Sequence, residues 1–286
     1  MKNTALLILW LAPALSHADV LLNTTIDCAD WEQGTQLNCD GLEWPSGQQT
    51  VDGNKTTITS VANNPAGGGK GVRFWVGDGH NVNSASLSWN YLGGGALPPQ
   101  KELWIRWYMR HEAGFRWDPL HFDKMLYIRT VNSIDAIPGF ANGKYVLLAQ
   151  GSPDYYQVAT NYTWEDIMGG SVSDGRFHCY EIHLKMDTNG ANGVGQVWID
   201  GVLRASNTAV NWSNGNATAR EGWRWFGFEE NQNAPANGRA MSIDYDDMVV
   251  YNTPPPNRDA AGNPFIGLIG GGGGKRPSPP TGLRTQ

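Results

Sequence analysis

The stretch Leu103-Trp-Ile-Arg-Trp-Tyr-Met-Arg110 decides the fold class, because its residues alternate in character with a period of two. Successive side chains of a β-strand point to opposite faces of the sheet. Every second residue is apolar, namely Leu103, Ile105, Trp107 and Met109. The residues between them are Trp104, Arg106, Tyr108 and Arg110. The stretch therefore predicts a strand with one face in the core and an aromatic, basic row on the other.

The same alternation recurs along the chain. In segment 177–186, one row is His178, Tyr180, Ile182 and Leu184, and the other is Cys179, Glu181, His183 and Lys185. Gln196-Val-Trp-Ile-Asp200 followed by Gly201 predicts a strand that enters a type I′ hairpin turn. Further strands are predicted at 71–76, 84–91, 123–130, 144–150, 155–160, 223–229 and 240–251. Sustained helical periodicity is absent, and only 164–168 suggests one short turn. The chain is therefore predicted to be all-β, a two-sheet antiparallel jelly-roll sandwich.

Three segments divide the 286 residues. Residues 1–18 carry a positive charge, a short apolar run and small residues at their end, which is the pattern of a signal peptide. Residues 19–253 are expected to form one jelly-roll domain. Residues 254–286 are rich in proline and glycine and are expected to be a disordered tail. We therefore expect a secreted protein, extracellular or periplasmic, without a membrane segment.

The three cysteines fit an oxidising compartment. Cys28 and Cys39 are close in sequence and are expected to form a disulfide. Cys179 lies in a strand-like segment and is expected to be a buried free thiol. A Cys28–Cys179 bridge remains an alternative, because sequence does not fix disulfide connectivity.

The net charge of −6 argues against a nucleic-acid partner, which requires a clustered basic surface. An acidic polysaccharide requires only a local basic groove. The thirteen Trp and ten Tyr suit both core packing and stacking on sugar rings. We therefore expect a polysaccharide partner, an acidic one, and a monomeric protein that binds neither nucleic acid nor membrane.

Three neighbouring segments carry a resemblance to a known group. They are Leu103–Arg110, Gly114-Phe-Arg-Trp-Asp118 and His121-Phe-Asp-Lys-Met125. Together they resemble a strand–loop–strand unit of the concanavalin A-like jelly-roll polysaccharide lyases that cleave glucuronan and alginate. Segments 176–190, 195–201 and 242–250 are similar to strands of the same fold. The resemblance covers about half of the chain and implies β-elimination of a uronic-acid polymer, with a role for Lys124.

Two motifs depart from these lyases. Phe122-Asp123 replaces a Gly-Gly pair before the lysine, and Glu181-Ile-His183 stands where another branch has Gln-Ile-His. Segment 244–247 and Trp31-Glu32-Gln-Gly34 resemble the parts of a structural Ca²⁺ site in related sandwiches. The metal-binding candidates are Glu32, Asp246 and Asp247. A solvated acidic strand end is the alternative for this acidic cluster, and no cofactor is expected to be required for the chemistry.

β-Elimination needs a group that neutralises the uronate carboxylate, a base for the C5 proton and an acid for the departing oxygen. The catalytic candidates are Lys124, Tyr108, His183 and Arg106. The substrate-binding candidates are Trp104, Arg110, Tyr127, Arg129 and Glu181. Strands distant in sequence become neighbours in a jelly roll, so we expect the catalytic candidates to line one concave surface.

Two other functions use the same fold. A non-catalytic carbohydrate-binding module would use Trp and Tyr as stacking platforms. A glycoside hydrolase of the laminarinase type needs two carboxylates on one strand face, typically as Glu-x-Asp-x-x-Glu, and that pattern is absent from the sequence. A polysaccharide lyase is therefore the favoured prediction.

Overall fold

The computed structural model describes residues 20–35, 39, 50–77, 87–89, 97–116, 122–131, 134–141, 144–151, 162–163, 174–231 and 237–270. Within these ranges the regular structure consists of strands and two short 3₁₀ turns, η1 (Ser60–Ala62) and η2 (Ala219–Glu221), without an α-helix. The all-β prediction is confirmed. In the same ranges, no helix is long and apolar enough to cross a membrane.

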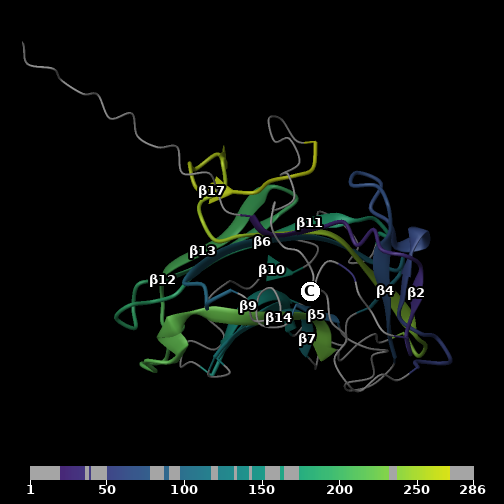
Figure 1. Ribbon diagram of the computed structural model, residues 1–286, viewed down its shortest axis with the longest axis horizontal. Coiled ribbons are helices and arrows are strands. Elements are labelled where there is room, and N and C mark those ends of the chain that lie inside the picture. The colour runs from purple at the N-terminus through teal and green to yellow at the C-terminus, as the bar shows by residue number, and fades with distance from the viewer. Residues whose placement is uncertain are drawn as a thin grey trace, which may run out of the picture.

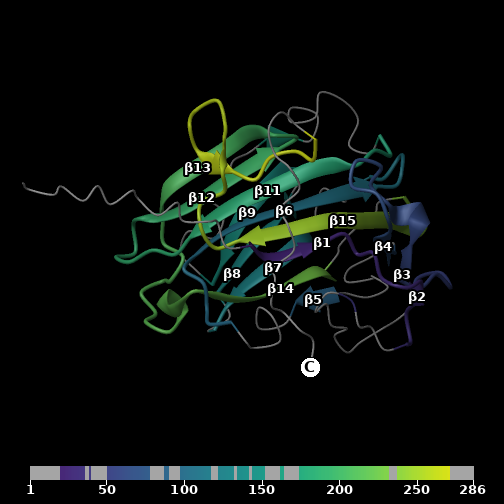
Figure 2. The ribbon, with the colours of Figure 1, turned by 45° about the horizontal axis from the view of Figure 1, so that its top comes forward.

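Two antiparallel sheets are stacked face to face (Figure 1). The larger sheet has the order β13 (Val202–Val210), β12 (Gly193–Ile199), β11 (His178–Lys185), β6 (Glu102–His111), β15 (Met241–Tyr251), β4 (Gly71–Val76), β3 (Thr57–Thr59) and β2 (Trp31–Glu32), and β1 (Val20–Thr24) pairs with β15. The smaller sheet has the order β10 (Tyr162–Thr163), β9 (Lys144–Gln150), β8 (Asp135–Ala141), β7 (Phe122–Thr130), β14 (Trp223–Asn231) and β5 (Leu87–Trp89). Figure 2 shows β6 between β11 and β15, both distant from it in sequence.

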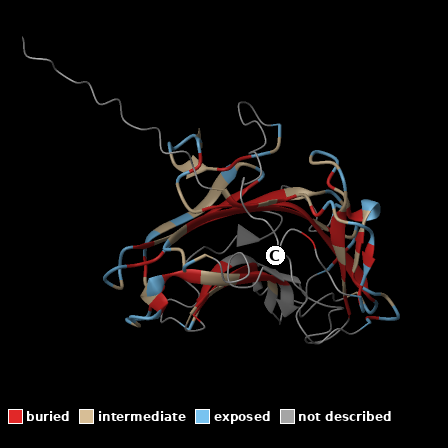
Figure 3. Ribbon diagram, viewed as in Figure 1, coloured by how far each residue is buried: buried red, intermediate tan, exposed pale blue. Residues whose placement is uncertain are grey.

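The core lies between the sheets and follows the predicted alternation. The residues predicted to face it from β6, namely Leu103, Ile105, Trp107 and Met109, are all fully buried in one hydrophobic cluster. From β11, Tyr180 pairs with Trp107 and their rings stack at 5.7 Å. Burying one Leu, Ile or Met side chain stabilises a fold by about 1.5–3 kcal/mol. Figure 3 shows the buried residues along the middle of both sheets.

The hairpin predicted after β12 is present. Asp200 and Gly201 both have positive φ angles, 50° and 77°, as a type I′ turn requires. Ile199 and Val202 pair directly across this turn. The two-residue turn therefore fixes the register between β12 and β13.

The predicted disulfide is also confirmed. Cys28 and Cys39 are bonded, with their Cα atoms 5.6 Å apart. Cys179 is a buried free thiol, so the alternative Cys28–Cys179 bridge is excluded. Residues 1–18, the predicted strand at 155–160 and the turn at 164–168 lie outside the described residues.

The prediction of a structureless tail is wrong for residues 254–270, which we call the C-terminal strap. The strap contains β16 (Asn257–Arg258) and β17 (Pro264–Phe265), which pair with each other. It crosses the outer side of the larger sheet, away from the smaller sheet (Figure 1). Ile266 is buried there against Trp104 and Tyr251. The strap is ordered because it buries an apolar side chain and, as described below, several polar ones; residues 271–286 lie outside the described part.

Candidate functional site

The aromatic and basic row of β6 lies beneath the C-terminal strap. The Trp104 Nε1 donates a hydrogen bond to the Pro264 carbonyl at 3.0 Å. Arg106 Nη1 donates to the Gly267 carbonyl at 3.0 Å, and the Tyr108 hydroxyl accepts from Ile269 N at 2.9 Å. Arg106 is only 4% exposed. These side chains therefore bind the protein's own C-terminal segment.

Glu181 and His183 of β11 lie on the same outer face. The two carboxylate oxygens of Glu181 accept hydrogen bonds from Ile266 N at 2.5 Å and Gly267 N at 2.9 Å. Burial raises the pKa of Glu181 to about 7, against the opposing effect of these bonds. The His183 ring stacks on Trp104 at 4.1 Å, and its nitrogens contact Gln196 and Glu102. Glu181 is thus the acceptor for the backbone of the strap.

The expectation of one concave surface shared by the catalytic candidates is wrong. Lys124 lies on β7 of the smaller sheet, whereas Arg106, Tyr108 and His183 lie on the larger one. Burial also raises the pKa of Tyr108, which makes this phenol a weaker proton donor and keeps it neutral. Trp104, Arg106, Tyr108 and Glu181 contact the strap directly, and His183 packs on Trp104, so none of these residues shares a surface with Lys124.

Arg110 has a structural partner as well. Its guanidinium and that of Arg73 both bind the buried carboxylate of Asp244, with Arg73 Nε at 2.7 Å and Arg110 Nε at 2.9 Å. Arg110 Nη2 also donates to the Val61 carbonyl at 2.7 Å. Arg73 and Arg110 thus join β4 and β6 to β15 through Asp244, and substrate binding by Arg110 stays a prediction.

Three other predicted residues do come together, on the outer face of the smaller sheet. Lys124 Nζ donates a hydrogen bond to the Tyr127 hydroxyl and lies 3.4 Å from Gln150 Oε1. The Arg129 guanidinium lies 5.4 Å from the Tyr127 ring and 4.9 Å from the Trp225 ring. We call Lys124, Tyr127, Arg129, Gln150 and Trp225 the basic cluster.

A β-bulge in β7 makes this arrangement. Lys124 pairs with Gly139 of β8 and Ile128 with Ala136, so β7 has one extra residue over this span. In a regular strand, residues three apart point to opposite faces. The bulge instead lets Met125 and Leu126 both enter the core, and Lys124 and Tyr127 share the outer face.

The electrostatics of the basic cluster are set by two cations and one carboxylate. Asp135 of β8 accepts a hydrogen bond from Arg129 Nε at 3.0 Å. Burial raises the pKa of Asp135, and the nearby Arg129 and Lys124 charges oppose this shift. Sequence analysis missed Asp135, Gln150 and Trp225. Gln150 follows the buried Ala149 in the strand, so its side chain points outward, and this alternation was the available signal.

The predicted calcium ligands do not form one set. Glu32 is exposed and pairs with Lys55 at 2.6 Å. Asp246 accepts from Asn64 N at 2.7 Å, and Asp247 accepts from Asn64 Nδ2 at 2.8 Å. Across the described part of the chain, no group of three His, Cys, Asp or Glu side chains could hold a metal ion. The residues named for Ca²⁺ therefore do not fit that ion together.

Several solved structures are similar to this chain. The endo-β-1,4-glucuronan lyase of the fungus Trichoderma reesei has a TM-score of 0.48 at 13% identity, covering 73% of this chain and 92% of the lyase. The alginate lyase of a Chlorella virus has a TM-score of 0.46 at 11% identity, covering 68% and 88%. A botulinum neurotoxin type C structure has a TM-score of 0.50 at 12% identity, covering 82% of this chain and 48% of the toxin chain. The fold is a jelly roll.

At these identities the likeness concerns the jelly-roll fold alone. No protein-family model and no curated protein sequence matches the chain. The function of this jelly roll must therefore be argued from its own side chains. The outer face of the larger sheet carries the strap. The outer face of the smaller sheet carries a lysine, a phenol and an arginine in contact.

Proposed function

We propose that this protein is secreted and acts on carbohydrate, as a polysaccharide lyase that cleaves a uronic-acid-containing polymer by β-elimination. One observation carries the proposal: the contact of Lys124 with the Tyr127 hydroxyl, next to Arg129, on the outer face of the smaller sheet. The Cys28–Cys39 disulfide and the signal-peptide pattern of residues 1–18 support secretion.

The basic cluster contains the groups that elimination requires. Arg129 can bind the uronate carboxylate beside its ion pair with Asp135, and neutralising that carboxylate acidifies the C5 proton. A base then takes the C5 proton, the C4–O bond breaks, a C4=C5 double bond forms and an acid protonates the departing oxygen. Tyr127 is only 3% exposed and lies against Lys124 and Arg129, so Lys124 is the proton-transfer group that reaches the substrate. With one proton removed from the Lys124–Tyr127 pair, Lys124 takes the C5 proton and then gives a proton to the departing oxygen, so the pair returns to its starting state.

The composition of the cluster favours a lyase over a hydrolase. Glycoside hydrolases use two carboxyl groups, roughly 5–10 Å apart, on either side of the bond. Asp135 is the carboxylate that contacts the basic cluster among the described residues, and it is already paired with Arg129. Trp225 favours the second candidate, a non-catalytic carbohydrate-binding module, because its ring is partly exposed beside Arg129 and can stack on a sugar.

The test is an assay with a panel of uronic-acid polymers, following absorbance near 235 nm, where the unsaturated product absorbs. Lys124→Ala should lower the rate by ~100-fold or more, the usual scale for loss of a general acid or base. Lys55→Ala, a surface lysine paired with Glu32 on the larger sheet, is the matched control and should leave the rate unchanged. Absence of product from every polymer, with binding that depends on Trp225, would instead establish the binding module.

A further inference from the structure

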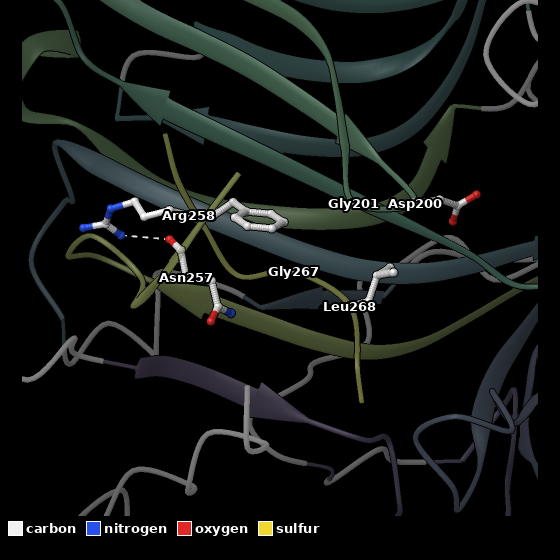
Figure 4. A pocket seen from close by; sticks show the side chains of 7 residues that line it. Asp200, Gly201, Asn257, Arg258, Gly267 and Leu268 are labelled. Carbon is white, nitrogen blue, oxygen red and sulfur yellow. Dashed lines mark hydrogen bonds between the residues drawn. The ribbon is translucent and has the colours of Figure 1, made fainter. Parts of the chain in front are cut away.

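A second site lies on the opposite face of the molecule from the basic cluster. A cleft of about 340 Å³ opens between the C-terminal strap and the β12–β13 turn. It is lined by Asp200, Gly201, Asn257, Arg258, Phe265, Gly267 and Leu268. Figure 4 shows Arg258 at one end and Asp200 at the other, with Gly267 and Leu268 between them. Its volume is at the lower end of the roughly 300–1,000 Å³ typical of small-molecule sites.

Buried contacts hold the walls of this cleft in place. The Phe265 ring stacks on the buried Trp198 at 6.1 Å, and Trp198 Nε1 donates to Asp259 at 2.9 Å. The backbone of Gly267 is fixed by Glu181, as described above. Asp200 accepts hydrogen bonds from Cys179 N and contacts His178 Nδ1, both at 2.9 Å. These contacts fix the walls of the cleft, which reduces the entropy lost on binding.

Arg258 is the group that indicates a ligand. Its Nη1 donates to the carbonyls of Pro255 and Asn257, which orients the guanidinium. Within the described residues, no carboxylate pairs with Arg258, whereas Arg73, Arg129 and Arg239 each have one. An oriented guanidinium with an unused edge is suited to bidentate binding of an external carboxylate.

The other lining groups suit the remainder of a sugar. Phe265 is partly exposed, and Leu268 is 38% exposed, so together they offer an apolar surface to the face of a pyranose ring. The Asp200 carboxylate and the Asn257 side chain offer hydrogen-bond acceptors to hydroxyl groups. An aromatic platform with a few convergent polar groups is the general composition of a small-ligand site.

We propose that this cleft binds a uronosyl residue, with its carboxylate on Arg258 and its ring against Phe265, as a second, non-catalytic polysaccharide site. The choice of a uronate rests on the proposed function, whereas the cleft and the unused edge of the Arg258 guanidinium do not. A chain bound here and at the basic cluster would contact both outer faces of the protein. Two sites joined by one polymer increase the overall affinity through the effective concentration of the second contact.

The experiment is native affinity electrophoresis of the full chain in gels that contain either a uronic-acid polymer or a neutral glucan. Each variant is tested in the Lys124→Ala background, so that cleavage does not alter the gel. Arg258→Ala should weaken uronate retardation by ~10-fold and leave the neutral-glucan gel unchanged. Arg258→Lys, which keeps the charge but loses the bidentate edge, should give an intermediate value. Arg239→Ala, an exposed arginine paired with Glu112, is the matched control and should behave as its parent.

Two measurements separate this inference from the proposed lyase activity. In the otherwise wild-type chain, Arg258→Ala should leave turnover of short uronate oligomers at 235 nm unchanged. Uronate retardation that Arg258→Ala does not reduce would overturn the inference even if the lyase activity exists. Arg258-dependent retardation without any 235 nm product would keep the cleft and reject the lyase. Thermal melts of each variant exclude loss of fold, because Arg258 is exposed and its truncation should leave the melting temperature within about 2 °C.

Discussion

Two tyrosines in this molecule have opposite surroundings, and their surroundings define what each can do. The Tyr108 hydroxyl accepts a hydrogen bond from the strap backbone, and burial raises its pKa. The Tyr127 hydroxyl instead accepts a hydrogen bond from the Lys124 ammonium. A phenol that contacts a lysine is suited to proton exchange, whereas a phenol bonded to backbone is suited to structural support.

Substitution of each tyrosine by phenylalanine tests this difference. Tyr127→Phe keeps the ring against Arg129 but removes the hydroxyl, so turnover should fall by ~100-fold with little change in melting temperature. Tyr108→Phe leaves the Ile269 amide without its acceptor and should destabilise the fold by about 1–3 kcal/mol while turnover is retained. Initial rates at 235 nm and thermal melts on both variants check the prediction. An inactive Tyr108→Phe beside an active Tyr127→Phe would contradict it.

His111 makes the free energy of unfolding depend on pH. Burial lowers its pKa to about 3 from an ordinary value of 6.5. Because the folded pKa is depressed, stability is fully present above pH 6.5 and falls as the pH decreases toward 3. Between pH 6.5 and 4.5 the free energy of unfolding falls by on the order of 2 kcal/mol. Urea unfolding should show that His111→Gln loses less stability than the wild type over this interval.

Glu181 changes stability with pH in the opposite direction from His111. The pH profile of the wild type must therefore be compared with that of His111→Gln. Its pKa is raised to about 7, so its contribution is present at low pH and is lost as the pH rises through that value. Subtracting the His111→Gln profile from the wild-type profile cancels the Glu181 contribution. An identical pH slope in the two proteins would show that His111 titrates normally in the fold.

At the scale of elements, the outer face of the larger sheet shows what sequence can and cannot predict. The period-two alternation of β6 correctly placed Trp104, Arg106 and Tyr108 opposite the core. It could not say whether that row meets solvent, a substrate or the protein's own chain, because all three favour polar and aromatic residues. The proline- and glycine-rich composition of 254–286 gave no sign that Ile266 is buried and that its amide binds Glu181 on this outer face.

The bulge in β7 is a second element-scale feature that sequence does not show. Strict alternation would place Lys124 on the core side with Leu126 and Ile128. Only the extra residue between the Gly139 and Ala136 pairings brings Lys124 beside Tyr127. The catalytic role of Lys124 stays a prediction, and its neighbours in the basic cluster follow only from the three-dimensional strand pairing.

The strap should depend strongly on Glu181. Glu181→Ala removes the acceptor of two strap amides. It also removes the carboxylate on which the charge of the buried Arg106 acts. Breaking one side of a buried charge arrangement typically destabilises a protein by about 3–5 kcal/mol. Glu221→Ala, at an exposed position in η2, should change stability by less than about 0.5 kcal/mol. Urea unfolding measures both, and hydrogen exchange should show faster exchange of the Ile266 and Gly267 amides in Glu181→Ala alone.

At the scale of the whole molecule, the two sheets have different outer surfaces. The strap covers polar side chains of the larger sheet and leaves a cleft at its edge, and the smaller sheet presents the basic cluster. Local cations on a chain with a net charge of −6 would attract an acidic polymer to particular positions and not to the surface in general. Under the proposed function, we expect specificity for such a polymer to depend on Arg129 and Arg258.

The Cys28–Cys39 disulfide ties the N-terminal segment to the jelly roll and links stability to the compartment. It closes a loop across a sequence separation of 11 residues. Restricting an unfolded loop of this length stabilises the folded state by about 3 kcal/mol in the chain-entropy estimate. The double variant Cys28→Ser/Cys39→Ser, like the wild type under reducing conditions, should lose about that amount in urea unfolding. Cys179→Ala is the control, and its effect should not change when a reductant is added, because this buried thiol forms no bond. Equal stability of the oxidised and reduced wild-type protein would show that the bridge, and therefore an oxidising compartment, is not needed for this fold.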